Sequence, residues 1–186
     1  MFAINLKLFL RKIKVFFLHN YWFLFDTGYR TMCCCTRFEA LSLKSLSQKL
    51  MVILRLTPDW FRGHYYLGIV SYFQCQTDRS GLFRARVTES FNVCSINPSL
   101  NNEAMLLEIL ANFLERKFEE IVSKIKEPEW EIAIKSLKKH EKFLLIEVAG
   151  SAYLALDKKD EAIRLFHKIP QEFRNAEIRA IISVSN

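Results

Sequence analysis

Residues 143–173 have the sequence FLLIEVAGSAYLALDKKDEAIRLFHKIPQEF, and this stretch decides the fold. Apolar residues recur at helical spacing on both sides of 157–160, DKKD, a polar break of the length that connects two helices. The small residues Ala149 and Gly150 would let a neighbouring helix come close. We therefore expect two short helices folded back on one another.

The spacing of four residues within this stretch resembles a known helical repeat. Gly150 is followed three positions later by Tyr153, nine further by Ala162 and four further by Phe166. This pattern is similar to that of the tetratricopeptide repeat (TPR) family, whose unit is a helix-turn-helix of about 34 residues. The resemblance implies that the small residues let the two helices pack closely while the aromatic rings fill the space between them. An unrelated helical hairpin is the alternative.

A second stretch, 56–70, LTPDWFRGHYYLGIV, resembles the same family. Pro58 ends a helical pattern over 38–56, and counting on by the repeat period places Gly68 at the family's small-residue position. Arg62 also matches one of two basic residues with which some TPR domains hold a chaperone's terminal carboxylate. Tyr66 stands at the place of the second, so the match to that group is incomplete.

The rest of the chain supplies further helices. We expect a loop at 74–81 and a helix at 82–96, then a pair within 101–128 capped by Asn101 or Asn102, and last helices at 128–137 and 175–184. The helix at 128–137 has no place in a strict repeat of about 34 residues. The predicted fold is therefore all-α: a short, irregular, right-handed superhelix of antiparallel helix-turn-helix repeats over 27–186, preceded by an apolar and basic segment, 1–26.

The composition agrees with packed helices. Of 186 residues, 51% are hydrophobic and 25% charged, and 16 are Phe. These values exclude a disordered chain. With 5 Gly and 4 Pro, the chain has too few turn residues for an all-β fold.

The positive charge is concentrated in the first part of the chain. Residues 1–100 hold 13 Lys and Arg against 5 Asp and Glu, whereas 101–186 hold 14 against 15. The asymmetry predicts an acidic partner for the N-terminal part, such as phospholipid headgroups, nucleic acid or an acidic peptide. The alternative is that these residues only keep an apolar N-terminus in solution.

Segment 1–26 contains four basic residues and no acidic residue before Asp26. Its charge-free runs are shorter than the roughly 20 apolar residues that span a bilayer, and no cleavage site of a secretory signal follows. It is either a helix that caps the repeats or an anchor in the membrane interface, with a mitochondrial presequence as a third alternative. In the anchor interpretation Cys33, Cys34 and Cys35 are lipidation candidates; otherwise they are small buried hydrophobic residues.

The five cysteines form no disulfide pattern, which indicates a reducing compartment, and we expect a cytoplasmic protein, at a membrane surface if 1–26 is an anchor. No phosphate-binding loop or nucleophile motif occurs, and the four His are scattered. We therefore expect no enzymatic activity, no cofactor, no metal and no small-molecule substrate.

Stacked helical hairpins are typical of proteins that bind other proteins in a concave groove. We accordingly predict a scaffold or adaptor for a partner peptide or helix. The family resemblance implies that the groove is lined by Arg62, Tyr65, Ile69, Tyr72, Leu144, Glu147, Ser151 and Leu154. As an alternative, DEAIRLFHKIP at 160–170 and NAEIRAIIS at 175–183 are also similar to the pentatricopeptide family, which implies binding of single-stranded RNA.

Overall fold

The computed structural model describes residues 37–77 and 81–184, which form α-helices and two short 3-10 turns and contain no strand. The helices are α3 (Arg37–Leu56), α4 (Phe61–Thr77), α5 (Gly81–Ser95), α6 (Asn101–Leu114), α7 (Phe118–Ile125), α8 (Pro128–Ser136), α9 (Lys139–Ala155), α10 (Lys159–His167) and α11 (Ala176–Ser183), with 3-10 turns at Pro98–Leu100 and Gln171–Phe173. The predicted all-α class is confirmed. The predictions for segment 1–26 and for Cys33, Cys34 and Cys35 lie outside the described residues.

The stretch that decides the fold forms the hairpin of α9 and α10, as predicted. A Cβ atom placed on Gly150 would lie 2.3 Å from Cε1 of Phe166, so this position of α9 has no room for a side chain. Ala162 and Phe166 of α10 are both completely buried. Asp157, with φ of 56°, turns the chain out of α9, and the next amide, Lys158, donates to the Tyr153 carbonyl at 2.9 Å.

The second predicted hairpin is formed by α4 and α5. A Cβ atom on Gly68 would lie 2.9 Å from Cβ of Ser90 in α5 and 2.6 Å from Cδ2 of Leu107 in α6, so three helices meet at this glycine. The predicted loop at 74–81 was too long, because α4 continues to Thr77. Gln74 is buried although it is polar, and packing therefore overrides the polar composition that suggested a loop there.

The third pair, α6 and α7, is also present, but its predicted cap is wrong. Asn101 lies inside α6, and the N-cap residue is Leu100, which makes no side-chain cap bond. Asn97 instead caps the preceding 3-10 turn, where its Oδ1 accepts from the Ser99 amide at 3.0 Å. The capping asparagine is therefore Asn97, before the 3-10 turn, and not Asn101 at the start of α6. Arg116, with φ of 61°, turns the chain between α6 and α7.

The last predicted helices are both confirmed. Pro128 is the first residue of α8, where its missing amide hydrogen costs nothing, and Trp130 anchors this helix in the core. Asn175 caps α11, because its Oδ1 accepts from the Ile178 amide at 2.8 Å.

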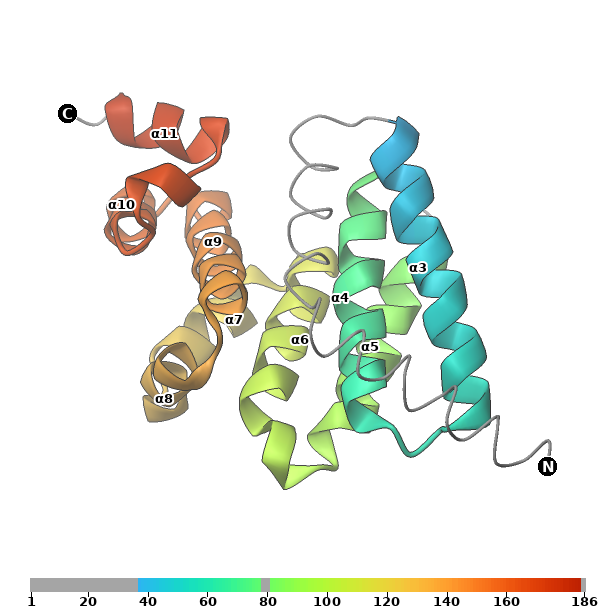
Figure 1. Ribbon diagram of the computed structural model, residues 1–186. Coiled ribbons are helices and arrows are strands. Elements are labelled where there is room, and N and C mark those ends of the chain that lie inside the picture. The colour runs from blue at the N-terminus through green and yellow to red at the C-terminus, as the bar shows by residue number, and fades with distance from the viewer. Residues whose placement is uncertain (1–36, 78–80, 185–186) are drawn as a thin grey trace, which may run out of the picture.

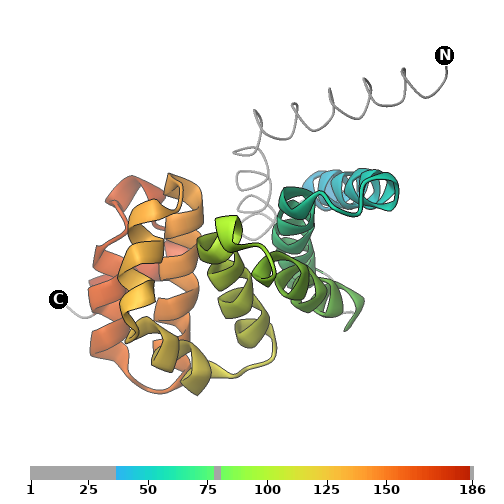
Figure 2. The ribbon, with the colours of Figure 1, turned by 90° about the horizontal axis from the view of Figure 1, so that it is seen from below.

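The described helices follow one another through space in nearly their order along the chain, from α3 at one end to α11 at the other (Figures 1 and 2). α4 packs against α3, α5 and α6, and its residues 65–74 are all buried. α9 packs against α6, α7 and α10, so α6 and α9 join the two halves. Within the described part of the chain, no helix has both the length and the apolar character needed to cross a bilayer.

A candidate inner-face binding site

The eight predicted groove residues lie on α4 and α9 but differ in accessibility. Four of them belong to the core, namely Tyr65, Ile69, Tyr72 and Leu144, each at most 2% exposed. The Arg62 side chain is 29% exposed, and Glu147, Ser151 and Leu154 are half-buried. The groove stays a prediction, and in this structure a partner could reach only the four accessible residues.

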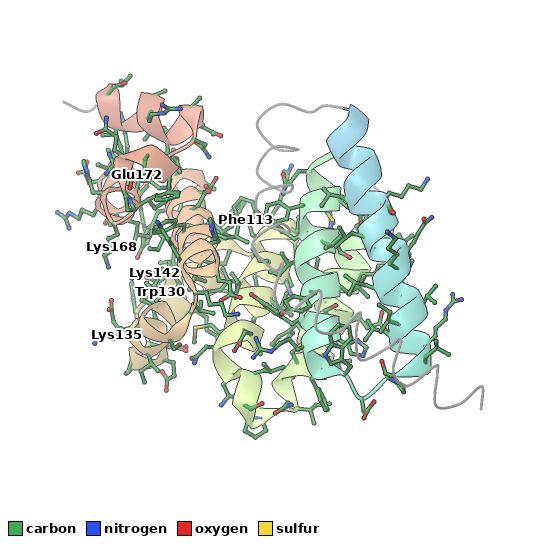
Figure 3. The ribbon with its side chains drawn as sticks, in the orientation of Figure 1. Phe113, Trp130, Lys135, Lys142, Lys168 and Glu172 are labelled. Atoms are coloured by element: carbon green, nitrogen blue, oxygen red, sulfur yellow. The ribbon has the colours of Figure 1, made fainter. Side chains whose placement is uncertain are left out.

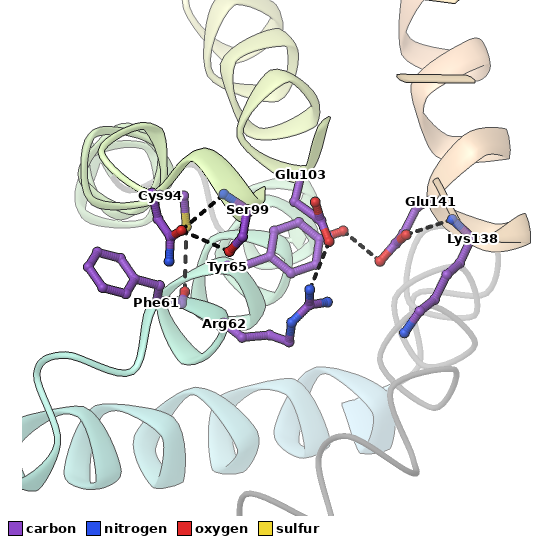
Figure 4. Close-up of polar contacts among 9 residues, drawn as sticks. Phe61, Arg62, Tyr65, Cys94, Ser99, Glu103, Lys138 and Glu141 are labelled. Carbon is purple, nitrogen blue, oxygen red and sulfur yellow. Dashed lines mark hydrogen bonds and ion pairs between the residues drawn. The ribbon is translucent and has the colours of Figure 1, made fainter. Parts of the chain in front are cut away.

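A hydrogen bond connects the predicted groove residue Tyr65 to α9. The Tyr65 hydroxyl of α4 donates to Glu141 Oε1 of α9 at 2.9 Å, across 76 residues of sequence (Figure 4). The other carboxylate oxygen of Glu141 accepts from the Lys138 amide at 2.8 Å, where α9 begins. Glu141 is only 2% exposed, so both oxygens are satisfied inside the protein and not by solvent.

The Arg62 guanidinium already has a carboxylate partner. Its Nη2 lies 3.0 Å from Glu103 Oε1 of α6, and the Glu103 side chain is 16% exposed (Figure 4). An incoming terminal carboxylate would have to compete with Glu103 for this cation, and Tyr66 supplies no second one. The geometry therefore does not favour the carboxylate-binding mode with which Arg62 was compared.

Burial dominates the electrostatics of this cluster. It raises the pKa of Glu141 above its ordinary value, although the hydrogen bonds from the Lys138 amide and the Tyr65 hydroxyl act in the opposite direction. Burial also raises the pKa of Tyr65, and the charge of Glu141 raises it further. Tyr65 consequently remains a hydroxyl donor at all physiological pH values.

A second pair of predicted groove residues, Tyr72 of α4 and Glu147 of α9, interacts electrostatically further along both helices. Burial raises the pKa of Tyr72 well above its ordinary range, and the nearby charge of Glu147 adds to this. Glu147 Oε1 also accepts from Nδ2 of Asn175 at 2.6 Å, which ties α9 to the start of α11. Because Tyr65 meets Glu141 and Tyr72 lies near Glu147, α4 and α9 run in the same direction along this surface.

We call this region the inner face and define it by its polar side chains, which are Arg62, Tyr65, Tyr72, Glu103, Glu141 and Glu147. Tyr65, Tyr72 and Glu141 lie beneath its surface, because each is at most 2% exposed. Sequence reasoning found the α4 residues and Glu147 but missed Glu103 and Glu141. Glu141 is the third residue of α9 and could have been recognised as a helix-capping residue. Nothing in the sequence marks Glu103 as a site residue, because an acidic residue in the first turn of a helix is usually solvated.

A second charged surface covers the C-terminal helices. Lys135, Lys142 and Lys168 lie over α8, α9 and α10, in the half of the molecule opposite α3 (Figure 3). Lys168 Nζ lies 3.8 Å from Glu131 Oε1, and both side chains are about half exposed. Because acidic and basic groups alternate there, this surface has no charge of a single sign that would select a partner of the opposite charge.

Cys94 is a structural thiol of the core. Cys94 is buried and donates to the Phe61 carbonyl at 3.5 Å (Figure 4). Burial raises the pKa of its thiol to about 12, and the thiolate that would act as a nucleophile is therefore rare at neutral pH. No group of three His, Cys, Asp or Glu side chains in the described ranges could hold a metal ion.

No protein-family model, curated protein or solved structure matches this chain.

Proposed function

We propose that this chain is a helical-repeat scaffold that binds a partner peptide or helix along its inner face. The observation that carries the proposal is the contact of Gly150 with Phe166, where a side chain of any size would collide with the ring. This is the close helix approach that the resemblance to the TPR family requires. Gly68 makes the equivalent approach in α4, which extends the same construction to a second hairpin.

The direction of the helices supports the same proposal. In an array of helical hairpins, the first helices of successive units run in the same direction and line one surface. α4 and α9, each the first helix of its hairpin, run in the same direction where Tyr65 meets Glu141. A right-handed superhelix, with the inner face on its concave side, is the arrangement we infer from these relationships.

The charge of the inner face indicates which partner it suits. Glu103 pairs with Arg62, and Glu147 is half-buried, so the accessible carboxylates outnumber the accessible cation. Leu154 adds an accessible apolar side chain of the predicted groove. A peptide or amphipathic helix with apolar anchors and a basic residue would complement this surface.

The same charges bear on the alternative of RNA binding by a pentatricopeptide-like protein. Phosphates would meet an excess of carboxylates on the inner face, so RNA would have to bind elsewhere. Titration of full-length protein with single-stranded RNA at several salt concentrations tests this. A steep loss of affinity with salt would favour RNA, because neutralised phosphates release counterions.

The scaffold proposal can be tested by selecting peptides from a display library against the full chain. Peptides that bind the inner face should lose affinity about tenfold when the half-buried Glu147 is changed by Glu147→Lys, because one close attraction becomes a repulsion. The matched control is Glu131→Lys on α8, whose side chain is 59% exposed. Equal effects of the two variants on every selected peptide, or no selected peptide at all, would contradict the proposal.

A further inference from the structure

The outward side of α3 differs in charge from the surface over α8, α9 and α10. Residues 40–58 contain no acidic residue and three basic ones, which are Lys44, Lys49 and Arg55. The nearest acidic residues along the chain are Glu39 and Asp59, beyond the two ends of this stretch. All three basic side chains are exposed, and none forms an ion pair with a residue that the structure describes. On the other surface, in contrast, Lys168 lies beside Glu131.

Two large apolar residues lie in the middle of this side of the helix. Val52 and Leu56 are one turn apart and are 55% and 51% exposed. With about 3.6 residues per turn, Lys44 and Arg55 fall on one side of this pair and Lys49 on the other. Single exposed apolar residues are common on proteins, but an apolar centre flanked by cations is typical of helices that lie in a membrane interface. We call these five residues the outer stripe.

The opposite side of α3 is fixed to the rest of the molecule. Leu43, Leu50 and Leu54 are buried there, and the helix packs against α4. α3 also lies at one end of the succession of helices, with α11 at the other end (Figures 1 and 2). Its 20 residues make a rod about 30 Å long. The outer stripe therefore runs along a rigid, accessible edge of the described array.

We propose that the outer stripe binds the surface of a membrane that contains anionic phospholipids. Val52 and Leu56 would lie among the headgroups, and the three cations would face the lipid phosphates and carboxylates. Lysine and arginine suit the two flanks, because their aliphatic stems can stay beside apolar groups while their charged ends reach the headgroups. The helix lies flat on the membrane in this arrangement. The proposal does not rest on the scaffold function and leaves the inner face free.

RNA is the competing partner, since its phosphates would also be attracted to these cations. Proteins that bind single-stranded nucleic acid combine cations with aromatic side chains on which the bases stack. Residues 43–56 contain no aromatic residue, and the exposed apolar residues of the outer stripe are aliphatic. A lipid surface accepts aliphatic side chains as well as cations, and it is therefore the better match.

Flotation of the full chain with vesicles of phosphatidylcholine, with and without phosphatidylserine, tests the charge of the stripe. We expect phosphatidylserine to strengthen binding and added salt to weaken it. Lys49→Gln together with Arg55→Gln should weaken binding about tenfold or more, because each basic residue near an anionic surface contributes roughly fivefold. The control is Lys126→Gln together with Lys135→Gln, which removes as much charge from exposed positions of the C-terminal half. It should weaken binding less than about twofold.

A second variant tests the apolar centre and separates lipid from RNA. Val52→Ser together with Leu56→Ser keeps every charge, so it should weaken vesicle binding at least about threefold and leave the affinity for single-stranded RNA unchanged. Ile132→Ser on α8, where the side chain is 59% exposed, is the control. All these side chains are on the surface, so the melts of the variants by circular dichroism should match that of the wild type. A photoreactive amino acid at position 52 should become linked to lipid, and one at position 132 should not.

Four results would overturn the proposal. The first is that the full chain does not bind vesicles containing phosphatidylserine. The second is that it binds them and both α3 variants bind equally well, which would assign the contact to another part of the chain. The third is equal labelling of lipid from positions 52 and 132. The fourth is that the change at Lys49 and Arg55 weakens binding to RNA but not to vesicles. None of these results affects the scaffold proposal, whose test depends on Glu147.

Discussion

Tyr65 and Glu141 join two helices that are 76 residues apart, through a hydrogen bond of 2.9 Å in which neither side chain has appreciable contact with solvent. The bond connects the predicted first helix of one hairpin to that of another, across α6. Its position helps to fix the placement of α4 relative to α9. Substitution of either residue therefore measures how much this bond between α4 and α9 contributes to the stability of the protein.

The Tyr65→Phe variant removes the hydroxyl and leaves the rest of the ring in place. Glu141 Oε1 would then lack its donor inside the protein, and we expect the free energy of unfolding to fall by about 1–3 kcal/mol. Urea unfolding followed by circular dichroism measures this. Tyr153→Phe is the control, because the Tyr153 hydroxyl makes no hydrogen bond to the described residues, and a change below about 0.5 kcal/mol is expected there. Equal losses in the two variants would show that the Tyr65 hydroxyl has no special role.

The pH dependence of stability should carry the signature of Glu141. Burial raises the pKa of this carboxyl in the folded state, so as pH rises through the ordinary value of 4.5 the unfolded state loses its proton first. Stability due to this group is therefore highest below that value and falls until the folded-state pKa has been passed.

The Glu141→Gln variant isolates this contribution. The difference in free energy of unfolding, wild type minus variant, should decrease as pH rises from about 4 through the folded-state pKa. Thermal or urea unfolding at several pH values gives the difference directly, and other titrating groups cancel in it. A difference that stays constant or increases with pH would mean that the folded protein does not raise the pKa of this carboxyl.

The parts of the fold that could be predicted from sequence are those set by short-range spacing. The Gly150 and Phe166 contact lies within one hairpin, and its residue types and intervals are visible in a single stretch. The hydrogen bond of Tyr65 to Glu141 joins two hairpins, and no local pattern indicates it. The end of α4 was missed for a related reason, because burial of Gln74 depends on neighbouring helices and not on the polar residues beside it.

The candidate site was predictable to a similar extent. The resemblance predicts that Arg62 and Glu147 line a common groove, which stays a prediction, but it says nothing about how closely α4 and α9 approach. That approach depends on α6, which packs against both helices. Tyr65 and Tyr72 were therefore predicted as open groove residues and are instead buried.

The Gly150→Ala variant tests the close helix approach. The added methyl group would overlap the ring of Phe166, which is completely buried and cannot simply turn into solvent. Alanine favours a helix over glycine by about 1 kcal/mol, but overpacking costs about 1–3 kcal/mol, so we expect net destabilisation at this tight site. A melting temperature measured by circular dichroism reports it.

A second substitution and a control make the result specific. Phe166→Leu frees space beside Gly150, so the double variant should lose less stability than the sum of the two single losses. Gly81→Ala is the control, since a Cβ atom there meets nothing within 4 Å, and it should be neutral or stabilising. Additive losses in the double variant would mean that Gly150 and Phe166 do not compete for the same space.

The turn between α9 and α10 offers a stabilising substitution. Asp157 has φ of 56°, a left-handed conformation in which its Cβ atom is strained, and its amide donates to the Leu154 carbonyl at 3.1 Å. Glycine adopts this conformation without strain and is the usual residue after a helix. Asp157→Gly should therefore raise the free energy of unfolding by about 0.5–1 kcal/mol, because relief of strain exceeds the entropy that glycine adds to the unfolded chain.

Two comparisons separate this effect from the simple loss of a charge. Asp157→Ala removes the carboxylate but keeps the strained Cβ atom, so it should give no gain in urea unfolding. Asp160→Gly lies in the first turn of α10, where glycine has no conformational advantage, and should lower stability. If Asp157→Ala stabilised the protein as much as Asp157→Gly, the cause would be removal of the aspartate's charge and not relief of backbone strain. The left-handed conformation at the end of α9 would then not favour glycine over other residues.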